Sequence, residues 1–130
     1  MDIRVRYGET DQMGYVYYGN YASYYEAARV ESIRHLGLSY KEMEEAGTLL
    51  PVLENYSKFI KPATYDEVLK IEVRVESKPT AKIRFDYSIH NEKGDLIHTG
   101  HTVLVFTSKE TGGPCRPDKN LIEAFEPYFS

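Results

Sequence analysis

The segment from residue 6 to residue 21 combines the residue types best suited to chemistry. It places the carboxylate of Asp11 between a strand pattern and the start of a helical pattern, with small Gly14 and Gly19 allowing close backbone approach. A helix N-terminus presents unpaired backbone N–H groups and positive dipole density. Such amides can hold a developing oxyanion while a nearby carboxylate acts on the same carbonyl carbon. From the residues alone, the alternative that Asp11 caps the helix or stabilises the loop is favoured.

A second carboxylate, Glu26, lies on the predicted helix and is the main rival acid. Because Glu26 and Arg29 are three residues apart, they can pair on the helix surface or at a subunit contact. We therefore interpret Glu26 as structural. Arg29 lies near the apolar stripe of the helix, so we expect it to be partly buried with its charge paired.

The thiol and imidazole groups do not form a recognisable site. The single cysteine, Cys115, follows the Gly- and Pro-rich stretch 112–114 in what we expect to be an exposed connection. No histidine lies near it in sequence, so we interpret it as an incidental free thiol. The spacing of the four histidines is not that of metal ligands, and we expect no metal site. They are His35, His90, His98 and His101.

Hydrophobic periodicity predicts the first elements that must position these residues. Alternation over residues 4–7 predicts a short strand that ends at Gly8. Residues 20–36 contain no Gly or Pro and place apolar side chains on one stripe, which predicts one long helix ended by Gly37. A short helix over residues 40–46 follows. The stripe comprises Tyr21, Ala22, Tyr25, Ala28, Ile33 and Leu36.

The second half of the chain predicts an antiparallel sheet. Alternating apolar and polar residues over 68–106, interrupted by a compact turn at 91–95, predict a three-stranded meander with one solvent-exposed face. Residues 50–60 add another strand. After the break at 112–114, a short terminal helix begins with Asp118 well placed to cap it.

This order of elements predicts a single α+β domain over residues 1–130, in which a curved antiparallel sheet packs on one helix. No internal repeat or linker divides the chain. Two architectures fit: a sheet wrapped around a central helix, and a cone-shaped sheet with its helices at one end. Periodicity does not choose between them.

Composition excludes several classes of partner. The 130 residues carry 16 Lys and Arg against 20 Asp and Glu, a formal charge of -4, which is opposite to the footprint of a nucleic-acid binder. The longest apolar stretches, 49–53 and 103–106, fall far short of the about 20 residues that span a bilayer. The charged start at residues 1–4 lacks a signal-peptide core. We expect no nucleic-acid partner, no membrane span and a cytoplasmic location.

The segment around Asp11 resembles the signature of the hotdog-fold acyl-CoA thioesterases. The matching residues are Tyr7-x-x-Thr10-Asp11-x-x-Gly14-x-Val16-x-Tyr18-x-Asn20-Tyr21 and then Tyr25-Glu26-x-x-Arg29. The most similar branch is the 4-hydroxybenzoyl-CoA thioesterase family, which includes the tol-pal-associated acyl-CoA thioesterases. A further string resembles the family's entry into its next strand, so the resemblance covers nearly the whole chain: Lys61-Pro62-Ala63-x-Tyr65-Asp66-Glu67-x-Leu69-x-Ile71.

The resemblance implies the hotdog fold, an antiparallel sheet wrapped around one long central helix. It also implies a homodimer or homotetramer with the active site at the subunit interface. Asp11 corresponds to the catalytic aspartate, acting as nucleophile or as general base for water. The oxyanion donor corresponds to the backbone N–H of Tyr18, in the loop that holds Gly19. The substrate-binding positions correspond to Gly14, Tyr15, Val16, Tyr17, Asn20 and Tyr21.

The activity that the resemblance implies is hydrolysis of an acyl-CoA substrate to a free carboxylic acid and coenzyme A, with no cofactor. Tol-pal-type members often carry a His where this chain has Tyr18, so we do not expect a His-assisted mechanism. Two alternatives remain: a non-catalytic module that binds acyl-CoA or acyl-carrier protein, and an acyl-carrier-protein thioesterase. Hydration of an enoyl thioester is not expected, because its His/Asp motif is absent. Basic candidates for the coenzyme A phosphates are Lys58, Lys61, Lys78, Lys82, Arg84 and Arg116.

Overall fold

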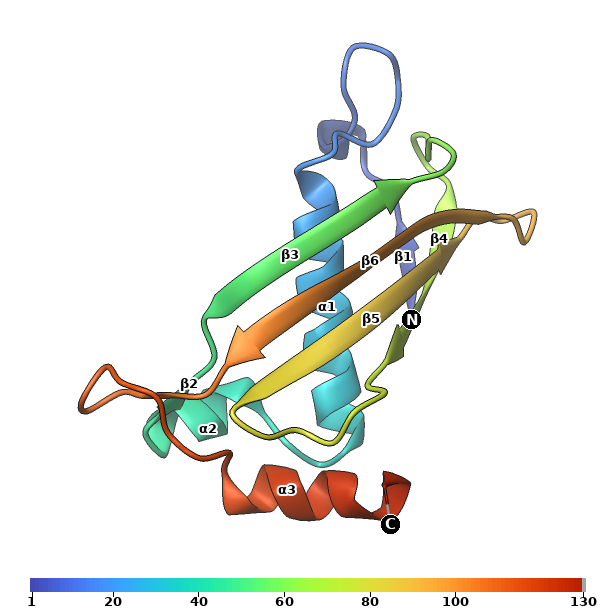
Figure 1. Cartoon of the computed structure of the whole chain (residues 1–130). Helices are drawn as coiled ribbons and strands as arrows, with labels where there is room; N and C mark the ends of the chain where they lie inside the picture. The colour runs from blue at the N-terminus through green and yellow to red at the C-terminus, as the bar shows by residue number, and fades with distance from the viewer. Residues whose placement is uncertain (130) are drawn as a thin grey trace.

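The computed structural model describes residues 1–129 and contains a five-stranded antiparallel sheet that covers one side of helix α1 (Figure 1). The strand order across the sheet is β1-β4-β5-β6-β3. The meander predicted over residues 68–106 is confirmed, because β4, β5 and β6 are neighbours in that order. The strands are β1 (Asp2–Arg4), β3 (Val52–Phe59), β4 (Val68–Arg74), β5 (Lys82–His90) and β6 (Leu96–Val105).

Helix α1 spans Asn20–His35, and Gly37 follows with a positive φ of 82°, as the sequence predicts. The predicted stripe needs one correction, because Ala22 is exposed whereas Tyr24 and Arg29 are buried. The N-terminal segment covers Tyr24 and the sheet covers Arg29, so α1 is enclosed over a wider arc than one apolar stripe. Its buried residues are Tyr21, Tyr24, Tyr25, Ala28, Arg29 and Ile33.

The N-terminal strand is shorter and earlier than the alternation over residues 4–7 predicts. Strand β1 ends at Arg4, and Tyr7–Glu9 forms a turn of 3-10 helix. The amide of Arg6 donates to Glu9 Oε1 at 2.8 Å, which closes this turn. The local hydrogen bond therefore ends the extended conformation before Tyr7.

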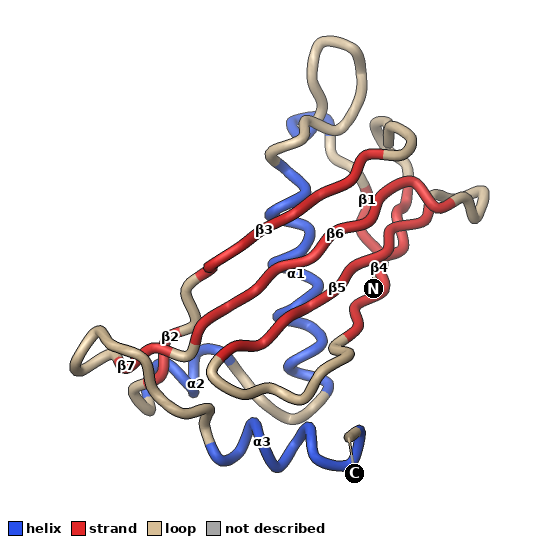
Figure 2. Tube along the Cα trace, viewed as in Figure 1, coloured by secondary structure: helices blue, strands red, loops and turns tan. Residues whose placement is uncertain are grey.

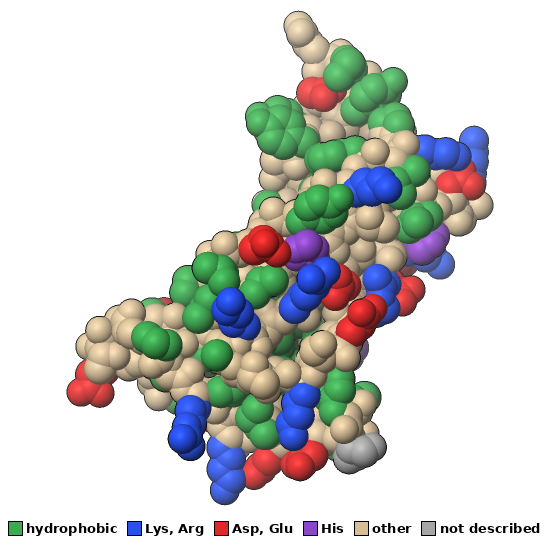
Figure 3. Space-filling view, in the orientation of Figure 1, with side chains coloured by type: hydrophobic (Ala, Val, Ile, Leu, Met, Phe, Trp, Pro, Cys, Tyr) green, Lys and Arg blue, Asp and Glu red, His purple; other side chains and the backbone are tan. Residues whose placement is uncertain are grey.

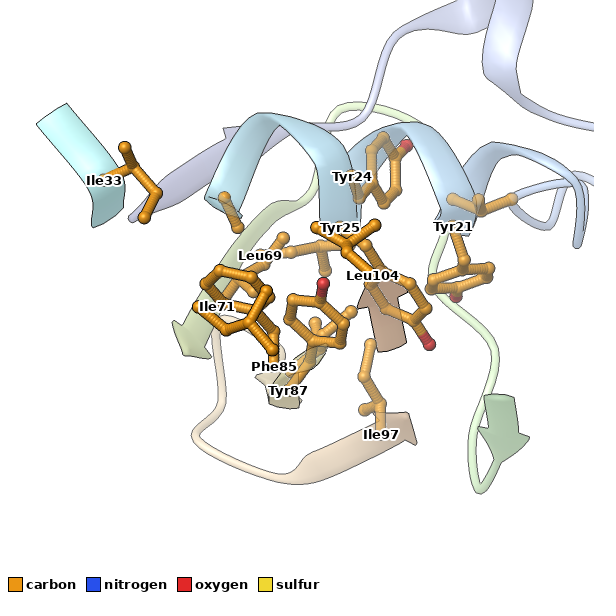
Figure 4. Packing of buried hydrophobic residues seen from close by; sticks show 14 of the residues in the cluster. Tyr21, Tyr24, Tyr25, Ile33, Leu69, Ile71, Phe85, Tyr87, Ile97 and Leu104 are labelled. Atoms are coloured by element: carbon orange, nitrogen blue, oxygen red, sulfur yellow. The ribbon is translucent and has the colours of Figure 1, made fainter. Parts of the chain in front are cut away.

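The central strand pairs and α1 enclose the core between them. In β5 and β6, alternate residues face α1, as the period of two requires. The rings of Tyr25 and Tyr87 stack with centroids 4.1 Å apart. Figure 4 shows Tyr21 and Tyr25 extending from α1 among the side chains of the sheet. The core thus fixes the start of α1 against β5 and β6.

Strand β3 forms one edge of the sheet, because it pairs only with β6, and β1 forms the other. It spans residues 52–59, close to the predicted 50–60, and seven of its eight residues are exposed. Gly100 on β6 lies opposite Ser57 on β3. This edge is therefore the part of the sheet that the chain itself covers least.

Short elements close the end of the molecule opposite the N-terminal loop (Figure 2). Helix α2 (Tyr40–Glu45) confirms the predicted helix, while the two-residue strands β2 (Thr48–Leu49) and β7 (Thr107–Ser108) are too short for periodicity to detect. The terminal helix α3 (Lys119–Phe125) forms and continues into the 3-10 turn η2 (Glu126–Tyr128).

Two local predictions at this end are wrong. The side chain of Asp118 makes no cap hydrogen bond to α3, although its backbone carbonyl accepts the first bond of the helix from the Ile122 amide at 3.1 Å. Cys115 is half-buried rather than exposed. Its amide donates to the carbonyl of Phe106 at 3.0 Å, which draws the connection onto the core.

Candidate active site

Asp11 belongs to the segment between the 3-10 turn and α1, and this segment forms the loop that projects beyond the N-terminal end of α1 (Figure 1). Its Oδ1 accepts hydrogen bonds from the amides of Met13 at 2.9 Å and Tyr15 at 3.2 Å. The backbone bond from the Asp11 amide to the Tyr15 carbonyl, at 2.8 Å, closes the loop. Gly14 has a φ of 80°, a conformation that favours glycine. The loop therefore holds the carboxylate through Oδ1, and Oδ2 has no hydrogen-bond partner within residues 1–129.

The same loop is bound to the segment between β3 and β4. Val16 is buried, and its amide donates to the Ala63 carbonyl at 2.9 Å. Tyr15 forms a bridge with Thr64. These contacts bring residues about 50 positions apart in sequence to the two sides of one site.

Glu9 ties the loop to α1, and the sequence did not reveal this residue. Its carbonyl accepts from the Tyr17 amide at 2.9 Å and from Asn20 Nδ2 at 2.8 Å. Its carboxylate accepts the Tyr24 hydroxyl at 3.1 Å. Burial and the neighbouring carboxylate raise the pKa of Tyr24 well above its ordinary value, so the hydroxyl keeps its proton. The only sequence signal is the spacing Arg6-x-x-Glu9, which closes the 3-10 turn.

The start of α1 offers two backbone donors. Gly19 is the N-cap residue, and the carbonyls of Tyr17 and Tyr18 accept from the amides of Asn20 and Tyr21 at 2.9 and 3.3 Å. The amides of Tyr18 and Gly19 themselves donate to no acceptor in the described part of the chain. A Cβ at Gly19 would lie 2.9 Å from the Tyr17 ring, so a side chain there would displace that exposed ring.

A cavity of about 480 Å³ lies where the loop, α1 and the end of β3 meet. Burial raises the pKa of Tyr21 in its wall to about 12, so this phenol is neutral. Figure 3 shows hydrophobic side chains gathered at this end of the molecule. The cavity combines one carboxylate with a largely apolar wall, as a site for an apolar acyl group requires. Its lining residues are Asp11, Met13, Tyr15, Val16, Tyr18, Tyr21, Phe59, Ile60, Lys61 and Pro62.

The cavity brings together five of the residues singled out from the sequence: Asp11, Tyr15, Val16, Tyr18 and Tyr21. The other four, Gly14, Tyr17, Gly19 and Asn20, shape the loop and the start of α1 without lining the cavity. On the opposite wall, residues 59–62, the sequence indicated only Lys61, as one of six basic candidates for the coenzyme A phosphates. Phe59, Ile60 and Pro62 were missed, because the Lys61-Pro62-Ala63 string was interpreted as the entry to a strand.

The expected ion pair between Glu26 and Arg29 does not form. Glu26 is exposed, whereas Arg29 is buried, and Arg29 has no carboxylate partner among residues 1–129. Arg29 Nη1 instead donates to the Tyr87 hydroxyl at 3.1 Å and to Thr102 Oγ1 at 3.3 Å. The two side chains point to different environments because α1 is covered on the Arg29 side and open on the Glu26 side.

The basic candidates for coenzyme A phosphates do not gather in one place. Lys61 lines the Asp11 cavity and lies 3.4 Å from Asp95 Oδ2. Lys78, Lys82 and Arg84 line a separate cavity of about 410 Å³. The remaining candidates, Lys58 and Arg116, line neither of these two cavities. Lys61 is therefore the one candidate cation beside Asp11.

Two features are absent from residues 1–129: a cluster of metal-ligand side chains and a helix that could span a membrane. No three His, Cys, Asp or Glu side chains converge in a group that could hold a metal ion. None of the helices has the length and apolar character needed to cross a membrane.

Comparison with known proteins identifies the family. The model of the thioesterase-like superfamily matches residues 5–125, nearly the whole chain. The chain belongs to this superfamily. The resemblance that the Asp11 segment indicated is therefore confirmed, and the chain is a thioester hydrolase with the hotdog fold.

Individual relatives agree with this assignment. A Bacillus subtilis (strain 168) protein named "Putative acyl-CoA thioesterase YneP" is 35% identical over 113 residues, covering 87% of this chain and 82% of the relative. The acyl-CoA thioester hydrolase YbgC of Escherichia coli O6:H1 is 26% identical over 124 residues, covering 95% of this chain and 92% of the relative. The crystal structure of a DHNA-CoA thioesterase from Staphylococcus aureus has a TM-score of 0.93 at 37% identity, covering 98% of this chain and 88% of that one.

Proposed function

We propose that this thioester hydrolase acts on acyl-CoA in the Asp11 cavity, converting the thioester and water to a carboxylic acid and coenzyme A. The observation that carries the proposal is the position of Asp11 and Tyr18 on the wall of one largely apolar cavity. The names of the relatives support coenzyme A as the thiol. Lys61 on the same wall offers a cation for its phosphates.

In the proposed mechanism, Asp11 acts through Oδ2. Oδ1 already accepts two backbone hydrogen bonds, which leaves Oδ2 with the lone pairs for the reaction. Oδ2 either attacks the thioester carbonyl carbon, which expels the coenzyme A thiolate and leaves a mixed anhydride that water then hydrolyses, or removes a proton from a water that attacks the same carbon. The Tyr18 backbone N–H holds the oxyanion, supported by the Gly19 amide at the positive end of α1. The leaving thiolate needs little protonation, because thiols ionise near physiological pH.

The acyl group occupies the apolar part of the cavity, against Tyr15, Val16 and Tyr21. Gly14, Tyr17 and Asn20 contribute by fixing the loop conformation. The DHNA-CoA thioesterase among the relatives makes an aromatic acyl group the first candidate. The reaction uses only water as co-substrate, so we propose that no cofactor takes part, and we place it in the cytoplasm.

We further propose that two or four chains assemble, with the active site at the subunit interface and α1 as the central helix that the sheet wraps. The exposed edge strand supports this assembly. Val52, Leu53, Tyr56 and Phe59 on β3 are each at least 50% exposed, a concentration of apolar surface on an unpaired strand edge. A partner chain would cover this edge and deepen the neighbouring cavity.

The test is thiol release from short-chain, long-chain and aromatic acyl-CoAs by wild-type protein and by Asp11→Asn. Asn keeps a side-chain oxygen for the two loop amides, so the loop should survive while turnover falls by about 10²–10⁴-fold. Glu26→Gln is the matched control and should leave turnover within about twofold. Near-normal turnover in a folded Asp11→Asn variant would rule out the assignment.

Two further outcomes identify the alternatives. If wild-type protein binds acyl-CoA without releasing thiol, the chain is a binding module. If it releases thiol only from acyl-carrier-protein thioesters, the carrier rather than coenzyme A is its substrate. A single turnover in H2¹⁸O then tests Asp11 as the nucleophile, because label in the Asp11 carboxylate identifies hydrolysis of an anhydride at the Asp11 carbonyl carbon.

A further inference from the structure

A buried histidine, His98, lies behind the wall of the cavity. The ring of Tyr21 lies parallel to that of His98, with centroids 3.9 Å apart. Phe59 packs edge-on against both, at 5.5 Å from Tyr21 and 4.8 Å from His98. Tyr21 and Phe59 line the cavity, while His98 is fully buried behind them. The catalytic proposal above does not use this histidine.

His98 takes part in a second contact layer, one step farther along the sheet. The Tyr25 hydroxyl lies within hydrogen-bond distance of His98 Nε2 and of Ser57 Oγ, which is 2.6 Å away. Gly100 stands opposite Ser57, and a Cβ there would overlap the Tyr25 hydroxyl. A glycine inside a strand often marks such a close approach. The fold therefore places the hydroxyl of Ser57 with a glycine opposite and a tyrosine behind it.

Ser57 faces the same side of β3 as the cavity wall. It is two residues from Phe59, and both contact α1, through Tyr25 and Tyr21, which are themselves four residues apart. Two strand residues advance about 7 Å and four helix residues about 6 Å, so the two layers are in step. Ser57 does not itself line the cavity, but it is half-buried, so part of its surface remains accessible.

The hydrogen-bond chain sets which way Ser57 donates. Burial lowers the pKa of His98 to about 4, so its ring is neutral and carries one proton. Nδ1 has no partner within residues 1–129. A buried N–H without an acceptor is rarer than an acceptor left without a donor, which favours the proton on Nε2. With the proton on Nε2, Nε2–H donates to the Tyr25 hydroxyl and Tyr25 donates to Ser57 Oγ, so the Ser57 hydroxyl keeps its own proton for a third group.

We propose that Ser57 is a specificity-determining residue whose hydroxyl donates a hydrogen bond to an oxygen substituent of the acyl group, about 7 Å beyond the part that contacts Phe59. This inference rests on the proposed function and assigns to Ser57 the recognition of a distal hydroxyl or carbonyl oxygen on the acyl group. Tyr25 and His98 are positioning residues, because they act through Ser57.

Two residues before Ser57 on β3, Asn55 is a further polar side chain, and its Oδ1 accepts a hydrogen bond from Thr102 Oγ1 at 2.8 Å.

The experiment uses two matched substrate pairs, hexanoyl-CoA with 6-hydroxyhexanoyl-CoA and benzoyl-CoA with its 4-hydroxy derivative. Wild-type protein should prefer the hydroxylated member of the pair that it cleaves by about two- to tenfold in kcat/KM, the value of one neutral hydrogen bond. Ser57→Ala should abolish this preference while leaving the unsubstituted member within about twofold. Ser57→Thr keeps a hydroxyl and should restore the preference, and Tyr25→Phe should weaken it.

Ser88→Ala is the control, because Ser88 lies on the opposite face of the sheet. This variant should not change the preference within either substrate pair. Equal losses for both members in Ser57→Ala would assign Ser57 a structural role and overturn the inference. An unchanged preference in Ser57→Ala would overturn it as well. If wild-type protein cleaves none of these four thioesters nor any of the acyl-CoAs in the panel above, the proposed function itself fails and this inference fails with it.

Discussion

The hydroxyl group of Tyr25 fills the space beside Gly100 that a Cβ atom at that position would need. The backbone of Gly100 does not have a positive φ, so the requirement for glycine is one of space rather than of conformation. The carbonyl oxygen of Tyr56 would also clash with an added Cβ, because it would lie 2.5 Å from it. The packing of α1 on β6 therefore depends on this pair.

Gly100→Ala should destabilise the fold. The added methyl group meets a buried hydroxyl and a backbone oxygen that cannot both move, and overpacking of this kind costs about 1–3 kcal/mol. Urea unfolding at neutral pH measures the difference in free energy. Gly8→Ala is the control, because an added Cβ there meets nothing within 4 Å. Equal stability of the two variants would show that the core yields more easily than its geometry indicates.

Glu9→Ala should lower both stability and turnover. It leaves the Tyr24 hydroxyl and the Arg6 amide without their acceptor, at a cost of about 1–3 kcal/mol, and loosens the loop that holds Asp11. Glu9→Gln keeps a side-chain oxygen and should lie nearer to wild type. Thermal unfolding and thiol release measure the two effects. Wild-type turnover in Glu9→Ala would show that the loop does not depend on Glu9.

His98 should make the fold less stable in mild acid. Its pKa is about 4 when folded and 6.5 in the unfolded chain, so below pH 6.5 protons bind the unfolded state preferentially. The stability present above pH 6.5 should fall as the pH drops to about 4, by on the order of 2–3 kcal/mol, and then level off. His98→Gln should lack this component. Urea unfolding of both proteins at several pH values between 7.5 and 4 gives the difference, and parallel curves would exclude His98 as the cause.

Leu53→Lys should weaken the proposed assembly. Leu53 is 57% exposed on the free edge strand, and a lysine there places a charge in any interface that covers β3. Light scattering after size exclusion should show a dimer or tetramer for wild type and a smaller mass for the variant. Leu96→Lys, at an exposed position on β6, is the control and should keep the wild-type mass. A monomeric wild-type protein would refute the assembly.

Hydrophobic periodicity was sufficient to locate the strands and helices that bury only one face. Strands β5 and β6 alternate cleanly because one face meets α1 and the other meets solvent. Helix α1 was located within one residue, but its buried surface was not, since Tyr24 and Arg29 are covered by chain segments distant in sequence. The family was evident from the Asp11 segment for a different reason: its residue types and spacing are local.

The sequence by itself determined the loop carboxylate, the glycines that shape the loop, and the helix that begins beside it. These features depend on neighbouring residues and on backbone conformations that a short segment specifies. Only the tertiary structure decided the second wall of the cavity at residues 59–62, the connection of Glu9 to α1, and the position of Ser57 before Tyr25 and His98. Each of these contacts depends on the register between strands and on the packing of α1 across them, which one-dimensional spacing does not encode.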